Sequence, residues 1–116
     1  MKLFHSPGAC SQAPYIMINE LGLKCEIVIV DFADRAELMK YNPRAQVPTL
    51  VLENGQVLTE TAVIMQYLAD QKPEMNFLPK VGTWERYKAI ESLNFVATEL
   101  HRGLGMMFSK DMPEAG

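Results

Sequence analysis

The chain has 116 residues, of which 48% are hydrophobic and 22% charged, a composition typical of one folded globular domain rather than a disordered segment. Its net charge of −3 argues against a nucleic-acid-binding surface, and its two cysteines are too few for a disulfide scaffold or a structural zinc site. No apolar run approaches the ~20 residues of a membrane helix, and the N-terminus lacks a signal-peptide pattern. We therefore expect a soluble, cytoplasmic protein with no metal, nucleic acid or membrane partner.

The first thirty residues predict a βαβ unit. Residues 2–5 are expected to form a strand that ends at a Ser-Pro-Gly turn over 6–8. Apolar residues at helical spacing predict a helix over 10–21, which Gly22 stops. Residues 25–30 include four successive β-branched side chains, a run typical of a strand covered on both faces in a parallel sheet.

The middle of the chain predicts a ββα unit. After a short helix over 34–40, strands are expected over 49–52 and 57–59, joined by the Asn-Gly hairpin signal at 54–55. A helix over 61–70 follows. Its apolar side is formed by Val63, Ile64, Tyr67 and Leu68.

A long helix is expected from Thr83 to about Phe108. Its apolar residues spread around more than one side: Tyr87, Ile90, Phe95, Val96, Leu100 and Leu104. Such a helix needs partners on more than one side, and the preceding segment can supply only one. We therefore expect more chain, a second subunit or both to complete the structure.

Cys10 is the first candidate functional residue. It follows a Pro-Gly turn where a helix begins, and the helix dipole there favours a thiolate, which is the reactive form of cysteine. The alternative is a small buried cysteine. Ala13 occupies the position where a Cys-X-X-Cys motif would need its second thiol, which disfavours a self-contained dithiol enzyme, and Cys25 is expected in the core.

Pro48 and Glu60-Thr61 are further candidates. Pro48 could start an edge strand, or form a cis peptide bond that exposes the backbone of Val47 to an extended peptide. Thr61 could cap its helix, or the helix start could bind a carboxylate while Glu60 takes an ammonium group. That pair would suit the charged end of an amino acid.

Three polar residues remain open between functional and structural roles. Asn94 and His101 are seven residues apart on the long helix, which is two turns, so both face the same way. They could equally be solvated polar residues. His5, near the end of the first strand, could face a site or flank the core.

Four stretches together resemble the glutathione transferases, and the bacterial beta class most closely. They are KLFHSPGACSQAP (2–14), YNPRAQVPTLVLENG (41–55), LTETAVIMQYLAD (58–70) and WERYKAIESLNFVATELHRG (84–103). The resemblance implies an α/β fold: a thioredoxin-like βαβ-ββα domain over 1–75, with a four-stranded mixed sheet. It also implies a linker over 76–82 and the first helix of a truncated all-helical C-terminal domain over 83–116.

The resemblance also implies residue roles at a glutathione site. Cys10 would lie beside the glutathione sulfur and form a mixed disulfide with it, with His101 as a polarising neighbour. Val47, before a cis Pro48, would pair with the cysteinyl unit through its backbone. The remaining expected contacts are Glu60 and Thr61 at the γ-glutamyl end, Arg35 near the glycine carboxylate, and Asn94, His5 and Ser11.

Three features depart from the family pattern. His5 stands where many relatives have tyrosine, and Ala45 replaces a common glycine. The chain also stops after one helix of the second domain, which supplies most of the electrophile pocket in the family, so we expect a fragment of a longer transferase.

The expected function is that of a glutathione transferase, which binds glutathione as co-substrate without a metal and directs its thiolate at an electrophile or a disulfide, typically in detoxification. The helices over 61–70 and 83–108 form the family's dimer interface, so a homodimer is expected. Two alternatives are a glutathione-dependent thiol–disulfide oxidoreductase acting through Cys10, and a non-catalytic transferase-like interaction module.

Overall fold

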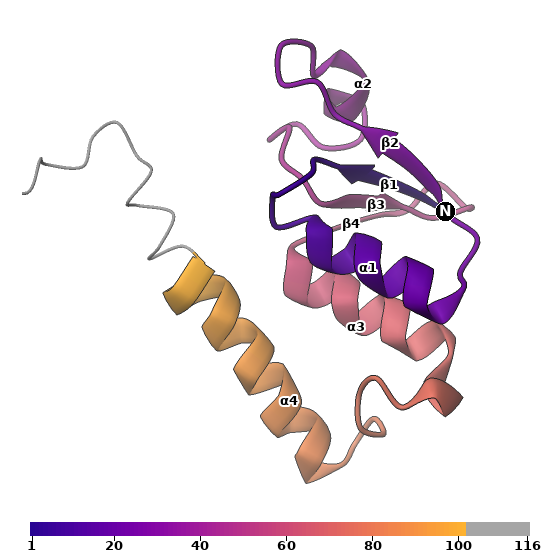
Figure 1. The fold of residues 1–116 in the computed structure, drawn as a ribbon, viewed down its shortest axis with the longest axis vertical. Helices are drawn as coiled ribbons and strands as arrows, with labels where there is room; N and C mark the ends of the chain where they lie inside the picture. The colour runs from indigo at the N-terminus through magenta and orange to yellow at the C-terminus, as the bar shows by residue number, and fades with distance from the viewer. Residues whose placement is uncertain (102–116) are drawn as a thin grey trace, which may run out of the picture. The chain divides into compact units, whose positions relative to one another are not determined.

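The computed structural model describes residues 1–101 of the chain, which form two compact units that divide between Leu78 and Pro79. The first unit is a mixed sheet with helices on both faces (Figure 1). Its elements are β1 (Lys2–His5), α1 (Gln12–Leu21), β2 (Glu26–Ile29), α2 (Ala36–Met39), β3 (Thr49–Val51), β4 (Val57–Thr59) and α3 (Thr61–Gln71). This order confirms the predicted βαβ-ββα arrangement of a thioredoxin-like fold.

The four strands lie in the order β2-β1-β3-β4. β1 pairs in parallel with β2 and antiparallel with β3, and β3 pairs antiparallel with β4. The Asn-Gly turn closes the β3–β4 hairpin, where Gly55 has a φ of 86°, a value that residues with a side chain rarely adopt. β1 is an interior strand that ends at His5, so the loop after His5 lies at one end of the sheet.

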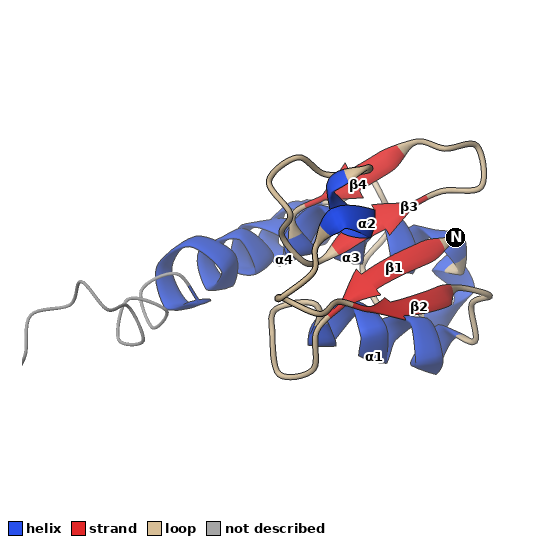
Figure 2. Ribbon diagram, turned by 90° about the horizontal axis from the view of Figure 1, so that it is seen from above, coloured by secondary structure: helices blue, strands red, loops and turns tan. Residues whose placement is uncertain are grey.

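Two apolar clusters attach the helices to the sheet. Neighbouring strand residues point to opposite faces, so Leu3 and Phe4 belong to different clusters. α1 and α3 cover one face and α2 covers the other (Figure 2). The first cluster contains Leu3, Ile18, Leu21, Leu50, Ile64 and Leu68, and the second contains Phe4, Val30, Leu38, Ala45 and Val51.

The prediction that the β-branched run over 27–30 is covered on both faces is wrong. β2 is an edge strand, and Ile29 leaves 59% of its surface exposed. The interior strands are β1, whose Leu3 and Phe4 are buried, and β3. A β-branched composition favours a strand but does not fix its place in the sheet.

The second unit contains α4 (Trp84–Phe95). Thr83 caps its start, because the Thr83 hydroxyl accepts a hydrogen bond from the Arg86 N–H at 3.2 Å. The helix continues as a π-helical segment over Val96–His101, and residues 102–108 of the expected long helix lie outside the described residues. Among the described residues of this unit, five apolar side chains are more than half exposed: Val81, Trp84, Tyr87, Phe95 and Val96. Within residues 1–101, no helix is long and apolar enough to cross a membrane.

Candidate functional site

The loop between β1 and α1 presents Cys10 at the end of the sheet. α1 begins at Gln12 with Ser11 as its N-cap residue, so Cys10 lies just before the helix rather than in its first turn. The thiol is partly buried and donates a hydrogen bond to the backbone carbonyl of Val47 at 3.1 Å. Two candidates 37 positions apart in the sequence therefore meet at one point.

The Val47–Pro48 peptide bond is cis, as one of the two interpretations predicted, and the strand that follows, β3, is an interior strand rather than an edge strand. The loop that carries it is fixed by a polar pair that the sequence reasoning missed. The Asn42 amide donates to the Gln46 carbonyl at 3.3 Å and to the Thr49 hydroxyl at 3.0 Å. The Thr49 hydroxyl in turn donates to the Gln46 carbonyl at 2.8 Å.

Asn42 and Thr49 are buried, so their hydrogen bonds hold the backbone on both sides of Val47 without competition from water. The available signal was an Asn-Pro turn whose asparagine lies seven residues ahead of a threonine that directly follows another proline. The sequence alone does not show that the two side chains bond to each other.

Glu60 and Thr61 lie at the start of α3, next to the end of β4. The reading in which Thr61 caps the helix is wrong, because Thr61 is the first helical residue and Glu60 occupies the N-cap without a side-chain bond. Glu60 has a φ of 70°, a conformation uncommon for residues other than glycine. Its carboxylate is exposed beside the free N–H groups of a helix start, which attract anions.

Arg35 is the N-cap residue of α2, and its side chain is oriented by two contacts. The guanidinium lies over the Phe32 ring, 4.5 Å from the centroid, and Nη1 donates to the Ala45 carbonyl at 3.4 Å. Ala45 has a φ of 50°, which explains why a glycine suits this position. Arg35 therefore contacts the same loop that carries Val47.

His5 and Ser11 are buried beneath the Cys10 loop, at 3% and 0% exposure. His5 Nδ1 lies 2.8 Å from the Ser11 hydroxyl, and the imidazole stacks on the Tyr15 ring with centroids 4.7 Å apart. Burial lowers the pKa of His5 below its ordinary value, although an interaction with the Ser11 backbone opposes this shift. Of the two interpretations of His5, the structure supports the one in which His5 flanks the core.

Asn94 and His101 belong to the second unit. Asn94 is exposed on α4, and its carbonyl accepts a hydrogen bond from the Thr98 hydroxyl at 2.9 Å. The side chain of His101 lies outside the described residues. The prediction that seven residues span two α-helical turns is wrong here, because the helix changes to i→i+5 winding at Val96.

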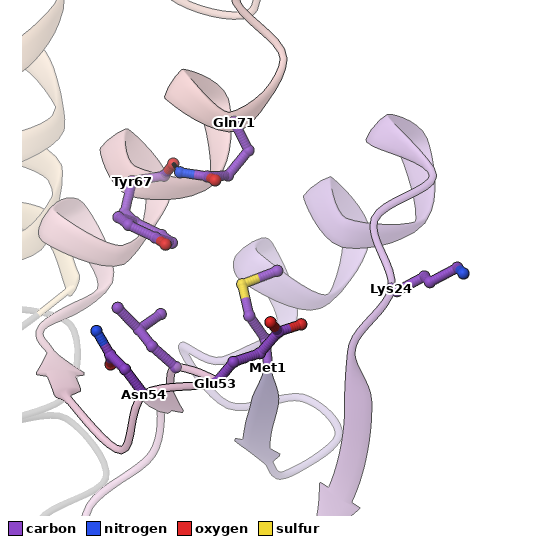
Figure 3. A pocket seen from close by; sticks show the side chains of 7 residues that line it. Met1, Lys24, Glu53, Asn54, Tyr67 and Gln71 are labelled. Atoms are coloured by element: carbon purple, nitrogen blue, oxygen red, sulfur yellow. Dashed lines mark hydrogen bonds between the residues drawn. The ribbon is translucent and has the colours of Figure 1, made fainter.

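Figure 3 shows a separate hollow of about 380 Å³. It lies where β1 begins, and Cys10 follows the other end of β1. It is lined by Met1, Lys24, Leu52, Glu53, Asn54, Tyr67 and Gln71, and it contains none of the predicted site residues. Cys25 lies at the same end and packs partly into the core, and burial raises its pKa. Within the described residues, no group of three acidic, histidine or cysteine side chains could hold a metal ion.

The fold and the site together define a thioredoxin-like domain that presents a thiol beside a cis-proline loop. The sequence profile of the glutathione S-transferase N-terminal domain matches residues 8–71, and the chain belongs to the glutathione S-transferase family. It is 45% identical over 119 aligned residues to glutathione S-transferase GstA of Escherichia coli O157:H7, covering 98% of this chain and 59% of that protein.

Solved structures of the same family superpose closely. A sphingomonad glutathione S-transferase complexed with glutathione has a TM-score of 0.93 at 39% identity. A beta-class enzyme of Sphingomonas chungbukensis has a TM-score of 0.92 at 41% identity. Each alignment covers 98% of this chain and 59% of the other, so this chain spans about three-fifths of the length of these relatives.

Proposed function

We propose that this chain binds glutathione along the loops that carry Cys10 and Val47, and that the whole protein is a glutathione transferase. The observation that carries the proposal is the contact between the Cys10 thiol and the Val47 carbonyl beside a cis proline. A peptide that pairs with the Val47 backbone brings its own central residue within reach of Cys10. The central residue of glutathione is a cysteine.

The two ends of glutathione are proposed to meet the charged groups around this contact. The γ-glutamyl carboxylate would bind the free N–H groups at the start of α3, with Thr61 beside them, and the Glu60 carboxylate would accept the ammonium group. Arg35, held over Phe32, would attract the glycine carboxylate. Asn94 and His101 are also proposed to contact glutathione, with His101 polarising the sulfur.

The proposed transferase reaction uses the sulfur of bound glutathione as the nucleophile. Its thiol loses a proton to solvent, the thiolate attacks an electrophilic carbon, a C–S bond forms and the leaving group departs with its electron pair. With oxidised glutathione, the Cys10 thiolate instead attacks the disulfide. That step forms a mixed disulfide on Cys10 and releases one glutathione thiolate.

Intact mass spectrometry of the 116-residue chain after incubation with oxidised glutathione tests the site. We expect one glutathione adduct that maps to Cys10 and disappears in Cys10→Ala. Cys25→Ala is the matched control and retains the adduct, because Cys25 lies at the other end of the sheet. Reduced glutathione should still bind Cys10→Ala in equilibrium dialysis. A folded chain that neither forms the adduct nor binds reduced glutathione contradicts the proposal and favours an interaction module.

A glutathione-dependent thiol–disulfide oxidoreductase is the second candidate. The observation that favours it is the partly buried Cys10 thiol, which is hydrogen-bonded to the Val47 carbonyl. Turnover of a glutathionylated peptide, compared with turnover of a chloronitrobenzene, separates the two activities. Loss of only the first activity in Cys10→Ala would assign thiol exchange to Cys10 and conjugation to the bound glutathione.

We further propose that the protein is a cytoplasmic homodimer that acts in detoxification of electrophiles. The exposed apolar side chains of Val63 on α3 and of Trp84 and Tyr87 on α4 support association. Light scattering at micromolar concentration tests this part, and a stable monomer would contradict it.

A further inference from the structure

The Ser11 hydroxyl is the centre of a buried hydrogen-bond cluster beneath Cys10. It accepts from the Ser6 N–H at 2.9 Å and donates to the Ser6 carbonyl at 3.2 Å. His5 Nδ1 is its third partner, at 2.8 Å. These bonds join the last residue of β1 to both ends of the loop that carries Cys10.

Counting donors and acceptors shows which role His5 Nδ1 takes when every contact of this cluster is a hydrogen bond. A hydroxyl has one hydrogen to donate and two lone pairs to accept with. Since Ser11 donates to the Ser6 carbonyl and accepts from the Ser6 N–H, all three contacts are hydrogen bonds only when His5 Nδ1 carries a hydrogen and donates it. The lowered pKa of His5 agrees with a neutral ring.

The orientation of the His5 ring is fixed from a second direction. The Tyr15 ring, on the first turn of α1, stacks on the imidazole at an interplanar angle of 2°. His5 therefore contacts the first turn of α1 through its face and the residue before α1 through its edge. Within the described residues, Ser11 is the sole hydrogen-bond partner of the His5 side chain, and the Cys10 thiol donates to the Val47 carbonyl instead.

We propose that His5 is a positioning residue for Cys10, which acts by donating its Nδ1 hydrogen to Ser11. The bond holds the 6–11 loop in the conformation that places the Cys10 sulfur at the Val47 carbonyl. His5 therefore controls the accessibility of the thiol without touching it. Only the consequence for glutathione depends on the proposed function, because the placement of the thiol belongs to the chain itself.

Two substitutions separate the donor from the ring. His5→Phe keeps an aromatic face for Tyr15 and removes the donor, whereas His5→Asn loses the ring and offers an amide N–H near the position of Nδ1. Ser11→Ala removes the acceptor. The measurement is the rate of alkylation by iodoacetamide at Cys10 relative to Cys25 in the same chain, followed by peptide mass spectrometry.

We expect His5→Phe and Ser11→Ala to raise the Cys10-to-Cys25 ratio by about threefold or more, because the released thiol leaves the Val47 carbonyl. His5→Asn should stay within about twofold of the unmodified chain, because the donor is restored. The proposal is overturned if folded His5→Phe shows the ratio of the unmodified chain, or if His5→Asn changes it as much as His5→Phe does.

Cys25, which packs partly into the core, reports on folding in every variant. If Cys25 of His5→Phe reacts at the rate of the urea-denatured chain, that variant is unfolded. The proposal then requires that Ser11→Ala raises the Cys10-to-Cys25 ratio and that His5→Asn does not. Alkylation by iodoacetamide requires no glutathione, so its result does not depend on the proposed function. A chain that fails to bind glutathione but responds to His5→Phe would refute the transferase proposal alone.

Discussion

The thiol of Cys10 and the carbonyl of Val47 lie 3.1 Å apart, although 37 positions separate them in the chain. This contact joins the β1–α1 loop to the loop before β3. The two loops meet because β1 and β3 are neighbours, and antiparallel pairing brings the end of β1 next to the start of β3. The candidate site is therefore a consequence of strand order.

Asn42→Ala should weaken both the fold and glutathione binding. The substitution removes the amide that donates to the Gln46 carbonyl and to the buried Thr49 hydroxyl. We expect this loss to lower the free energy of unfolding by about 2 kcal/mol. Because the same bonds hold the backbone beside Val47, the dissociation constant for glutathione should rise about tenfold.

Asn54→Ala is the matched control for that substitution. Asn54 lies in the exposed hairpin turn and bonds only with Gln56 in the described structure, so its loss should cost less than about 1 kcal/mol. Urea denaturation and calorimetric titration of both variants provide the comparison. Equal costs for the two variants would show that the buried pair does not support the loop.

Glu60→Gln should weaken glutathione binding with little effect on stability. The Glu60 side chain is exposed and makes no capping bond, so the free energy of unfolding should change by less than about 0.5 kcal/mol. Loss of the charge should raise the dissociation constant for glutathione by about fivefold or more. A glutathione analogue without its amino group should bind both forms equally, and Glu53→Gln serves as the control. A similar effect of Glu60→Gln on both ligands would argue against an ammonium contact.

Stability should decrease as the pH falls below about 6.5, with His5 as one cause. Burial lowers the pKa of His5 in the folded chain below its ordinary value of 6.5. The unfolded chain therefore takes up the proton first, and the free energy of unfolding declines as the pH falls from 6.5 towards the folded pKa. Above 6.5 the neutral ring carries no such penalty.

Urea denaturation at about pH 7.5 and about pH 5.5 measures this loss for the unmodified chain and for His5→Asn. His101 is common to both, so the difference between the two losses isolates His5. The unmodified chain should lose more stability than the variant. Identical losses would mean that His5 titrates alike in the folded and unfolded chains.

Leu68→Ala tests the cluster that holds α3 to the sheet. Leu68 on α3 is fully buried against α1 and the sheet, and its truncation should lower the free energy of unfolding by about 3 kcal/mol. Val63→Ala, on the same helix but 44% exposed, should cost less than about 1 kcal/mol. Comparable costs would contradict the assignment of the buried face of α3.

The sequence by itself determined the order of elements and most of their bounds. Periodicity, the stop at Gly22 and the Asn-Gly turn are local signals, and local signals were sufficient for β1, α1 and the β3–β4 hairpin. The family motifs identified the candidate site residues. Local composition could not assign the edge position of β2, because a strand's neighbours are not encoded in its own residues.

Only the tertiary structure decided which polar groups meet. The contact of Cys10 with Val47, the bond between Asn42 and Thr49, and the cluster of His5 with Ser11 each depend on backbone positions in space. A hydrogen bond requires two atoms within about 3 Å in a narrow range of angles, and a list of residue types specifies neither. For that reason the sequence named His5 and Ser11 as candidates, whereas the fold showed that they lie beneath the loop of Cys10.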